Sequence, residues 1–340
     1  MLRIPFDELH LAVAGAFRAL GFAEERAAVC ARLFAETTRD GVYTHGLNRF
    51  PRFVRMIRAG RIDIHAALQR VASHGSLERW DGRSGPGNWN AYQSMARALE
   101  LARVHGVGVV ALANTTHWMR GGSYGWQAAE AGFIGVCWTN TLPNMPPWGS
   151  AEARLGNNPL VVAVPRPAGP VVLDMAMSQF SYGALAAYRE RGELLPVNGG
   201  YDRAGQLTRD PAEIEASQRP LPAGYWKGSG LAIVLDLIAA MLSGGWATHQ
   251  IPKDPDRETG ISQFFLAIDP AALSPAGAAA EIADRVVASV SSDPCHNPCR
   301  YPGQRTLELR AENLALGVPV DAAIWETVLE MNRAGPAPIG

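Results

Sequence analysis

The residues best suited to chemistry stand in the short run 40–49, which contains both a histidine and an arginine. If a helix begins after Thr44, with the threonine hydroxyl as its cap, His45 and Arg49 lie four residues apart on one face. An imidazole can transfer a proton near neutral pH, and a guanidinium binds a carboxylate with two hydrogen bonds. Reduction of a 2-oxo acid requires both, because the carboxylate must be held while the carbonyl oxygen receives a proton. A single histidine is more often structural, so this run needs support from other segments.

Two further polar segments follow predicted strands, where ligands collect in α/β folds. The segment 114–122 contains His117, and the segment 138–149 contains Thr141 between prolines and tryptophans. From residue type and position, we expect Arg49, His117 and Thr141 to contact the substrate. The prolines of the second segment are equally consistent with a rigid structural turn.

Two glycine-rich segments match neither a dinucleotide fingerprint nor a Walker A loop, but one of them could bind an anion. The nearest match to a dinucleotide fingerprint, 106–111, closes a helix and opens a strand, whereas the fingerprint does the reverse. The segment 224–230 lacks the residue order of a Walker A loop. Its backbone N–H groups, at a helix N-terminus beside Lys227, can still bind a phosphate or carboxylate. A glycine-rich turn with a surface lysine explains the segment equally well.

Helical periodicity occupies both ends of the chain, and strands alternate with helices in the middle. Helices are predicted over 8–20, 23–34, 46–57, 91–105, 124–131, 181–191, 278–290, 307–316 and 322–331, with another after 230. Strands are predicted over 107–113, 133–139, 160–164, 170–175 and 263–268, and a polar loop over 196–222. A hairpin of 160–164 with 170–175, beside helical crossovers, makes the sheet mixed. We therefore predict an α/β chain with a helical domain over 1–70, a mixed-sheet domain over 71–275 and a helical segment over 276–340 that packs on the first domain.

Composition narrows the partner to a small molecule. The 31 Lys and Arg against 32 Asp and Glu leave a net charge of -1, without a basic surface for nucleic acid or an anionic membrane. The start of the chain is acidic, unlike a secretory signal, and the longest apolar stretch, 231–242, contains Asp236. Four cysteines are too few for a disulfide framework, and Cys295, His296 and Cys299 lack a second ligand pair for a metal. We expect a cytoplasmic protein without a metal site.

Four of these runs occur together, in this order and spacing, in one known family. The runs are 41–53, 117–130, 145–149 and 224–231. Over nearly its whole length the chain resembles the malate/L-lactate dehydrogenase family that lacks a Rossmann fold. The resemblance implies a three-layer α/β domain on a mixed sheet, with a helical domain built from both chain ends, in a homodimer.

The resemblance also implies a reaction: hydride passes from NADH or NADPH to the C2 carbonyl of a 2-oxo sugar acid. His45 would be the proton donor, and 2,3-diketo-L-gulonate is the leading substrate. The resemblance assigns cofactor contacts to three segments, namely Val172, Leu173, Asp174, Met175, Ala176, Met177 and Ser178; Trp226 and Lys227; and Gly303, Gln304 and Arg305. A helix N-terminus would lower the pKa of His45, whereas Asp40 and a bound carboxylate would raise it.

Departures from the family pattern leave alternatives open. Thr44 stands where serine is common, Met177 where many members have threonine, and Arg305 where similar members carry glutamate. Arg305 could favour the 2′-phosphate of NADPH. The alternatives are a reductase of malate, lactate or Δ1-piperideine-2-carboxylate, and a sugar-acid-binding protein that has lost catalysis. The second is disfavoured, because His45, Asp174 and Lys227 all remain in their motifs.

Overall fold

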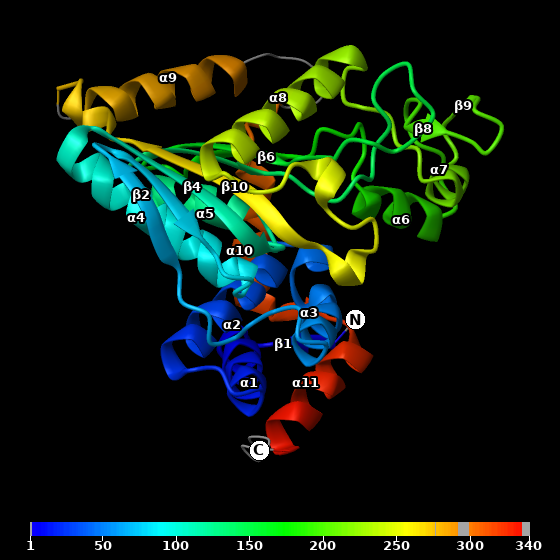
Figure 1. The fold of residues 1–340 in the computed structure, drawn as a ribbon, viewed down its shortest axis with the longest axis horizontal. Helices are drawn as coiled ribbons and strands as arrows, with labels where there is room; N and C mark the ends of the chain where they lie inside the picture. The colour runs from blue at the N-terminus through cyan, green and yellow to red at the C-terminus, as the bar shows by residue number, and fades with distance from the viewer. Residues whose placement is uncertain (1, 276, 292–298, 335–340) are drawn as a thin grey trace.

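A seven-stranded mixed sheet forms the centre of the computed structural model, which describes residues 2–275, 277–291 and 299–334 (Figure 1). Its strand order is β2-β3-β4-β10-β5-β6-β7. The strands are β2 (Gln69–His74), β3 (Leu77–Asp81), β4 (Val107–Thr116), β5 (Ile134–Thr139), β6 (Leu160–Val164), β7 (Val171–Met175) and β10 (Thr259–Ile268). Only β3 and β4 pair in parallel, and the predicted hairpin of β6 and β7 is present with Leu160 opposite Met175. The prediction of a mixed sheet is confirmed.

Helices cover both faces of the sheet, which gives three layers. The helices α4 (Gly87–His105) and α5 (Gly122–Glu130) pack on one face, and α8 (Trp226–Ser243) packs on the other. Side chains alternate along each strand, so on β10 Phe265 joins the core beneath α4 and α5 while Phe264 joins the core beneath α8. The predicted α/β class without a Rossmann order is confirmed.

Both ends of the chain build one helical lobe beside the sheet. Its helices are α1 (Phe6–Ala19), α2 (Glu24–Arg39), α3 (Phe50–Arg58) and α11 (Ala322–Ala334). The strand β1 (Leu2–Ile4) pairs antiparallel with β11 (Val318–Val320), and the preceding helix is α10 (Gln304–Leu316). Figure 1 shows the first and last helices, blue and red, at the same end of the molecule. Buried Phe17, Phe34, Phe50 and Phe53 form the centre of this lobe.

The predicted loop 196–222 is partly wrong, because short elements form within it. They are β8 (Gly200–Tyr201), β9 (Leu207–Thr208) and α7 (Pro211–Ser217), which lie beside α6 (Tyr182–Glu190). Asp210 caps α7 by accepting hydrogen bonds from the N–H groups of Ala212 and Glu213. Ile214 is fully buried with Leu185 and Leu195. Two-residue strands have no periodicity to detect, so only the Asp-Pro capping signal was present in the sequence.

The remaining helices are α9 (Ala278–Ser291) and the short 3₁₀ turns η1 (Tyr43–His45), η2 (Leu47–Arg49), η3 (Thr248–Gln250), η4 (Pro255–Arg257) and η5 (Pro270–Ala272).

Among the described helices, α8 alone is long and apolar enough to cross a membrane, by length and composition. One face of α8, which includes Ala232, Leu235 and Ala239, is buried against the sheet. A helix that covers a sheet needs this apolar face, so its hydropathy has a structural cause.

Candidate active site

His45 and Arg49 lie in two short 3₁₀ turns, η1 and η2, and not in a continuous helix. The turns η1 and η2 are separated by Gly46, and α3 begins at Phe50 with Pro51 in its first turn. A Cβ on Gly46 would overlap the side chain of Thr38, whose hydroxyl accepts a hydrogen bond from the N–H of Leu47. The helix predicted over 46–57 is therefore confirmed from Phe50 onwards, but its predicted start after Thr44 is wrong, because this close backbone approach bends the chain.

Thr44 does not cap the helix, but its hydroxyl contacts the candidate catalytic imidazole. Its Oγ1 lies 3.1 Å from Nδ1 of His45 and forms a hydrogen bond with it. This bond fixes the ring through Nδ1, so Nε2 is the nitrogen left to exchange a proton with a ligand. His45 is partly buried, whereas Thr44 is exposed.

A second histidine lies against the first. The rings of His45 and His117 are stacked, with centroids 5.8 Å apart and planes inclined by 22°. The N–H of Met119 donates a hydrogen bond to Nδ1 of His117 at 3.0 Å. In the neutral ring the proton is then on Nε2. Two segments that are far apart in the sequence, and were each only weak candidates, therefore meet at one place.

Burial and positive charge keep both imidazoles neutral. Burial, followed by the charges of Arg49 and Arg120, lowers the pKa of His45 to about 4. Burial, followed by Arg49 and His45, lowers the pKa of His117 as well. In the absence of a bound anion, both imidazoles are neutral at pH 7. A negative ligand charge would favour the protonated form of His45.

Arg49 is held by a glutamate that the sequence analysis did not single out. Its guanidinium lies 3.5 Å from a carboxylate oxygen of Glu258, a residue only 4% exposed. The N–H of Leu142 donates to the other oxygen of Glu258 at 3.4 Å, which brings the Thr141 segment to the same carboxylate. Burial raises the pKa of Glu258, against the opposing effect of Arg49. Glu258 directly precedes β10, and no pattern in the sequence marks it.

Thr141 lies close to this pair, but its hydroxyl already has protein partners. Its Oγ1 donates to the carbonyl of Leu142 at 3.2 Å or to Oδ1 of Asn157 at 3.1 Å. Its N–H donates to Oδ1 of Asn158 at 3.1 Å. Thr141 is buried, so any ligand contact would compete with these hydrogen bonds.

Asp40 does not raise the pKa of His45, contrary to the expectation from the sequence. Burial opposes ionisation of Asp40, but hydrogen bonds from Arg310 and the charges of Arg120 and Arg39 outweigh it and lower its pKa to about 2. Arg310 binds both of its oxygens at 2.9 Å, and Arg120 donates at 2.8 Å. The charge of Asp40 is therefore compensated by three guanidinium groups.

Arg120 is a second residue that sequence reasoning missed, although it belongs to the segment of His117. Its Nε is buried without a hydrogen-bond partner and lies 3.9 Å from a carboxylate oxygen of Asp174. The same oxygen accepts a hydrogen bond from the N–H of Gly122 at 2.9 Å. Arg120 thus connects Asp40, in the helical lobe, with the strand expected to bind the cofactor. Its basic side chain at the end of a strand was the available signal.

The three segments expected to contact a cofactor lie along the edge strand β7. The carbonyl of Pro302 accepts a hydrogen bond from the N–H of Val172, which places the turn of Gly303, Gln304 and Arg305 beside one end of the strand. Past the other end, the carbonyl of Met177 accepts from the N–H of Ala223, beside the turn that leads to Trp226 and Lys227. From Val172 to Ser178 the strip is roughly 20 Å long, at about 3.3 Å per residue.

The strip from Val172 to Ser178 and the two turns beside it have exposed side chains and offer hydrogen-bond donors, as a dinucleotide site requires. Lys227 is exposed at the N-terminus of the 18-residue helix α8 and forms no ion pair with any residue that the structure describes. A free ammonium beside a helix N-terminus is a suitable phosphate site. Leu173 and Trp226 are exposed along the strip, to 37% and 66%. Arg305 is exposed and donates to Glu308 at 3.2 Å.

The described residues hold no group of three or more His, Cys, Asp or Glu side chains that could bind a metal ion. Cys299 is exposed and free. Cys295 and His296, considered with it in the sequence analysis, lie outside the described residues.

Comparisons with known proteins agree with the resemblance found in the sequence. The family model described as malate/L-lactate dehydrogenase matches residues 4–329. A 2,3-diketo-L-gulonate reductase of Citrobacter koseri is 47% identical over 333 residues, covering 96% of this chain and 99% of the relative. A 2,3-diketo-L-gulonate reductase of Shigella boydii is 46% identical over 332 residues, with the same two coverages.

Solved structures show the same fold. Sulfolactate dehydrogenase from Methanocaldococcus jannaschii superposes with a TM-score of 0.91 at 25% identity, covering 98% of this chain and 97% of the other. A Δ1-piperideine-2-carboxylate reductase from Pseudomonas syringae superposes with a TM-score of 0.87 at 26% identity, covering 97% of this chain and 100% of the other.

Proposed function

The chain belongs to the malate/L-lactate dehydrogenase family and is an oxidoreductase, and we propose that it reduces 2,3-diketo-L-gulonate to 3-dehydro-L-gulonate with NADH or NADPH. Relatives bearing the name 2,3-diketo-L-gulonate reductase are 46–47% identical over nearly the whole chain, which supports the substrate. The main observation that supports this reaction is that His45 stacks on His117 and that the charge of Arg49 helps to lower the pKa of His45.

In this proposal His45 donates the proton. Because Thr44 engages Nδ1, Nε2 of His45 faces the substrate and protonates the oxygen that forms at C2. The reduced nicotinamide, when bound, supplies the hydride to C2. His117, with its proton on Nε2, donates a hydrogen bond to a substrate oxygen without changing charge.

Arg49 would bind the substrate carboxylate and also link binding to protonation. A guanidinium can present two parallel donors to a carboxylate, and Glu258 holds that of Arg49 at 3.5 Å. The bound carboxylate offsets the charge of Arg49 and so raises the pKa of His45 from about 4 towards its ordinary value. In this proposal His45 therefore takes up its proton when the substrate binds.

The experiment that tests this function follows absorbance at 340 nm with the purified protein, each cofactor in turn and a panel of acids. The panel contains 2,3-diketo-L-gulonate, pyruvate, oxaloacetate and Δ1-piperideine-2-carboxylate. We expect preferential turnover of diketogulonate, with most turnover lost in His45→Ala and little change in cofactor affinity. His74→Ala is the control, because His74 is exposed on the far edge strand β2. Full activity of His45→Ala would refute the assignment.

A second candidate substrate is a cyclic imino acid, favoured by the structural similarity to Δ1-piperideine-2-carboxylate reductase at 26% identity. The same panel separates the two. Preferential turnover of Δ1-piperideine-2-carboxylate would retain the roles of His45 and Arg49 and reject the sugar acid.

For the cofactor, we propose that Lys227 binds a phosphate group at the N-terminus of α8, and that Arg305 favours NADPH. Arg305 is exposed beside one end of the strip and retains free donors after its bond to Glu308. In Arg305→Ala we expect kcat/KM for NADPH to fall and that for NADH to stay unchanged. An equal fall with both cofactors would reject this role for Arg305.

We also propose a cytoplasmic homodimer in which the outward face of α8 is covered. Ile233, Val234, Leu237 and Met241 lie on this face, and Met241 is 76% exposed. Neighbouring large apolar side chains on one helix are typical of an interaction surface. Light scattering should show a dimer that Leu237→Glu dissociates. Leu11→Glu, at an isolated leucine 63% exposed on α1, is the matched control.

A further inference from the structure

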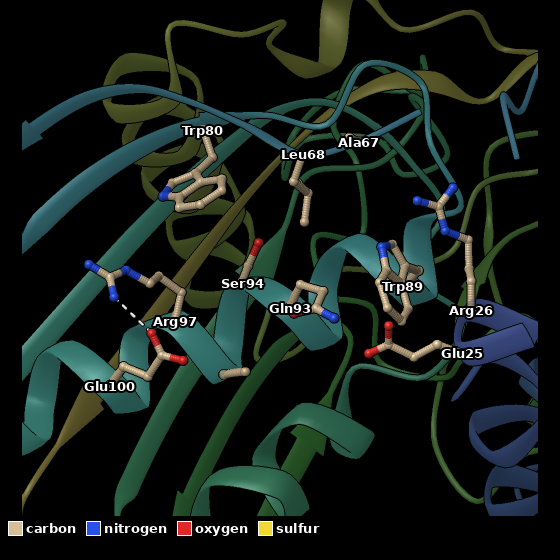
Figure 2. Close-up of a pocket in the computed structure, with 11 residues that line it drawn as sticks. Glu25, Arg26, Ala67, Leu68, Trp80, Trp89, Gln93, Ser94, Arg97 and Glu100 are labelled. Atoms are coloured by element: carbon tan, nitrogen blue, oxygen red, sulfur yellow. Dashed lines mark hydrogen bonds and ion pairs between the residues drawn. The ribbon is translucent and has the colours of Figure 1, made fainter. Parts of the chain in front are cut away.

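A cavity that is separate from the candidate active site lies between the helical lobe and the sheet domain. Its volume is about 390 Å³, and its walls come from α2, α4, β3 and the segment before β2 (Figure 2). None of the residues assigned above to substrate or cofactor lines it. It lies on the face of the sheet that α4 covers, so the proposed dimer surface on α8 would leave it open. Cavities of about 300–1,000 Å³ hold small organic ligands.

Two tryptophan rings flank this cavity, and each is fixed by an ionic partner. Nε1 of Trp80 donates to Glu78 at 2.9 Å, and Arg97 holds the same buried carboxylate at 2.8 Å. The guanidinium of Arg26 lies 5.3 Å from the ring centroid of Trp89. Arg26 is tethered in turn to the backbone carbonyls of Ile64 and Ala66. The two indole rings are thus preorganised without a ligand.

Polar groups without partners line the cavity between these rings. Ser94 is only 3% exposed, and its hydroxyl has no hydrogen-bond partner. Figure 2 shows this hydroxyl pointing towards the space below Leu68, between Trp80 and Trp89. Gln93 lines the same space, and its side chain forms no hydrogen bond with any residue that the structure describes. A buried hydroxyl without a partner is unfavourable, and a ligand hydroxyl would satisfy it.

The four charged side chains that line the cavity, Glu25, Glu100, Arg26 and Arg97, balance in formal charge. Glu25 and Glu100 both line it, and Glu25 forms no ion pair within the described chain. The guanidinium of Arg97 is already bonded to Glu78 and Glu100. The guanidinium of Arg26 also lines the cavity, donates to two backbone carbonyls and lies over the ring of Trp89. Neutral hydroxyl groups could donate to the carboxylates of Glu25 and Glu100.

We propose that this cavity binds an uncharged monosaccharide, with the C–H face of the sugar ring on the indole of Trp80 and its hydroxyls on Ser94, Gln93 and Glu25. Flat apolar walls with convergent amide, hydroxyl and carboxylate groups match a ring that is apolar on its faces and polar at its edge. This inference does not depend on the reaction proposed above, because the cavity shares no residue with that site.

Saturation-transfer NMR with D-glucose, D-xylose and L-arabinose tests the proposal, with D-gluconate as the charged probe. We expect binding of at least one neutral sugar and about tenfold weaker binding in Trp80→Leu, which corresponds to about 1.4 kcal/mol of lost stacking. Gln93→Ala should also weaken binding, and it removes no hydrogen bond from the described chain, so it keeps the test valid if Trp80→Leu fails to fold.

Two control variants separate this cavity from the active site. His45→Ala and His74→Ala should bind the neutral sugars as the unmodified protein does. The proposal is overturned if no neutral sugar binds at tens of millimolar, if D-gluconate binds in preference, or if both cavity variants bind like the unmodified protein. Weaker binding in His45→Ala would assign the signal to the active site and also overturn it.

Discussion

The low pKa of His45 should make the stability of the protein depend on pH in a way that one substitution removes. In the folded chain, burial and then Arg49 and Arg120 lower the pKa of His45 from 6.5 to about 4. The unfolded chain keeps the ordinary value, so between pH 6.5 and 4 it binds more protons than the folded chain. The free energy of unfolding therefore falls as pH falls through this window. Below pH 4 the stabilisation that His45 contributes at neutral pH is fully lost.

The size of the effect follows from the two pKa values of His45. Their difference corresponds to about 3 kcal/mol in the free energy of unfolding. At pH 5, the unfolded histidine is mostly protonated and the folded one mostly neutral, so about 2 kcal/mol of this is already lost.

Urea unfolding of the unmodified protein and of His45→Gln, at about pH 7.5 and about pH 5, measures this contribution. Glutamine fills similar space and does not titrate. Between the two pH values the unmodified protein should lose about 2 kcal/mol more than the variant. The exposed His74, replaced in His74→Gln, is the matched control and should keep the full dependence. If His45→Gln retained it too, the argument that His45 is buried and neutral would be refuted.

Three further predictions concern turnover. Because the free enzyme holds the pKa of His45 at about 4, kcat/KM for reduction should fall about tenfold per pH unit between about pH 5 and pH 8; a flat profile would contradict the role of His45 as proton donor. Gly122→Ala should raise the KM for the cofactor more than that for the acid in initial-rate assays, since a Cβ would lie 2.6 Å from Oδ2 of Asp174; unchanged cofactor kinetics would argue against a role for Asp174. Arg49→Lys keeps the charge but loses the paired donors, so the KM for the acid should rise about tenfold or more; an unchanged KM would mean that another group holds the carboxylate.

The sheet could be predicted because its strands and helices carry their own periodicity. The β6–β7 hairpin and the helix stop at Gly106 followed from residues close together in the sequence. The helix after Thr44 could not be judged this way, since the bend depends on how closely the backbone at Gly46 approaches Thr38. Local spacing cannot detect a contact with an earlier helix.

The candidate site was predictable in part and for a similar reason. Its motifs marked His45 and His117, but their stacking depends on the lobes packing together. Glu258 reaches Arg49 across 209 positions of sequence, and nothing near Glu258 indicates that partner. Asp40 was noticed for its charge, yet its binding by Arg310 decides its effect, and that arginine lies 270 positions away.

The pairing of β1 with β11 also sets an order of events during synthesis. The helical lobe that carries His45 contains the first helix and the last, and its strand pair joins Leu2 to Val320. At about 5–20 residues per second, the ribosome needs about 15–60 s to add the roughly 300 residues between α1 and β11. During that time the apolar face of α1 lacks α11, against which it packs in the finished lobe. The sheet can form while the chain is still being made, whereas the lobe that carries His45 can be completed only after β11 and α11 have been added.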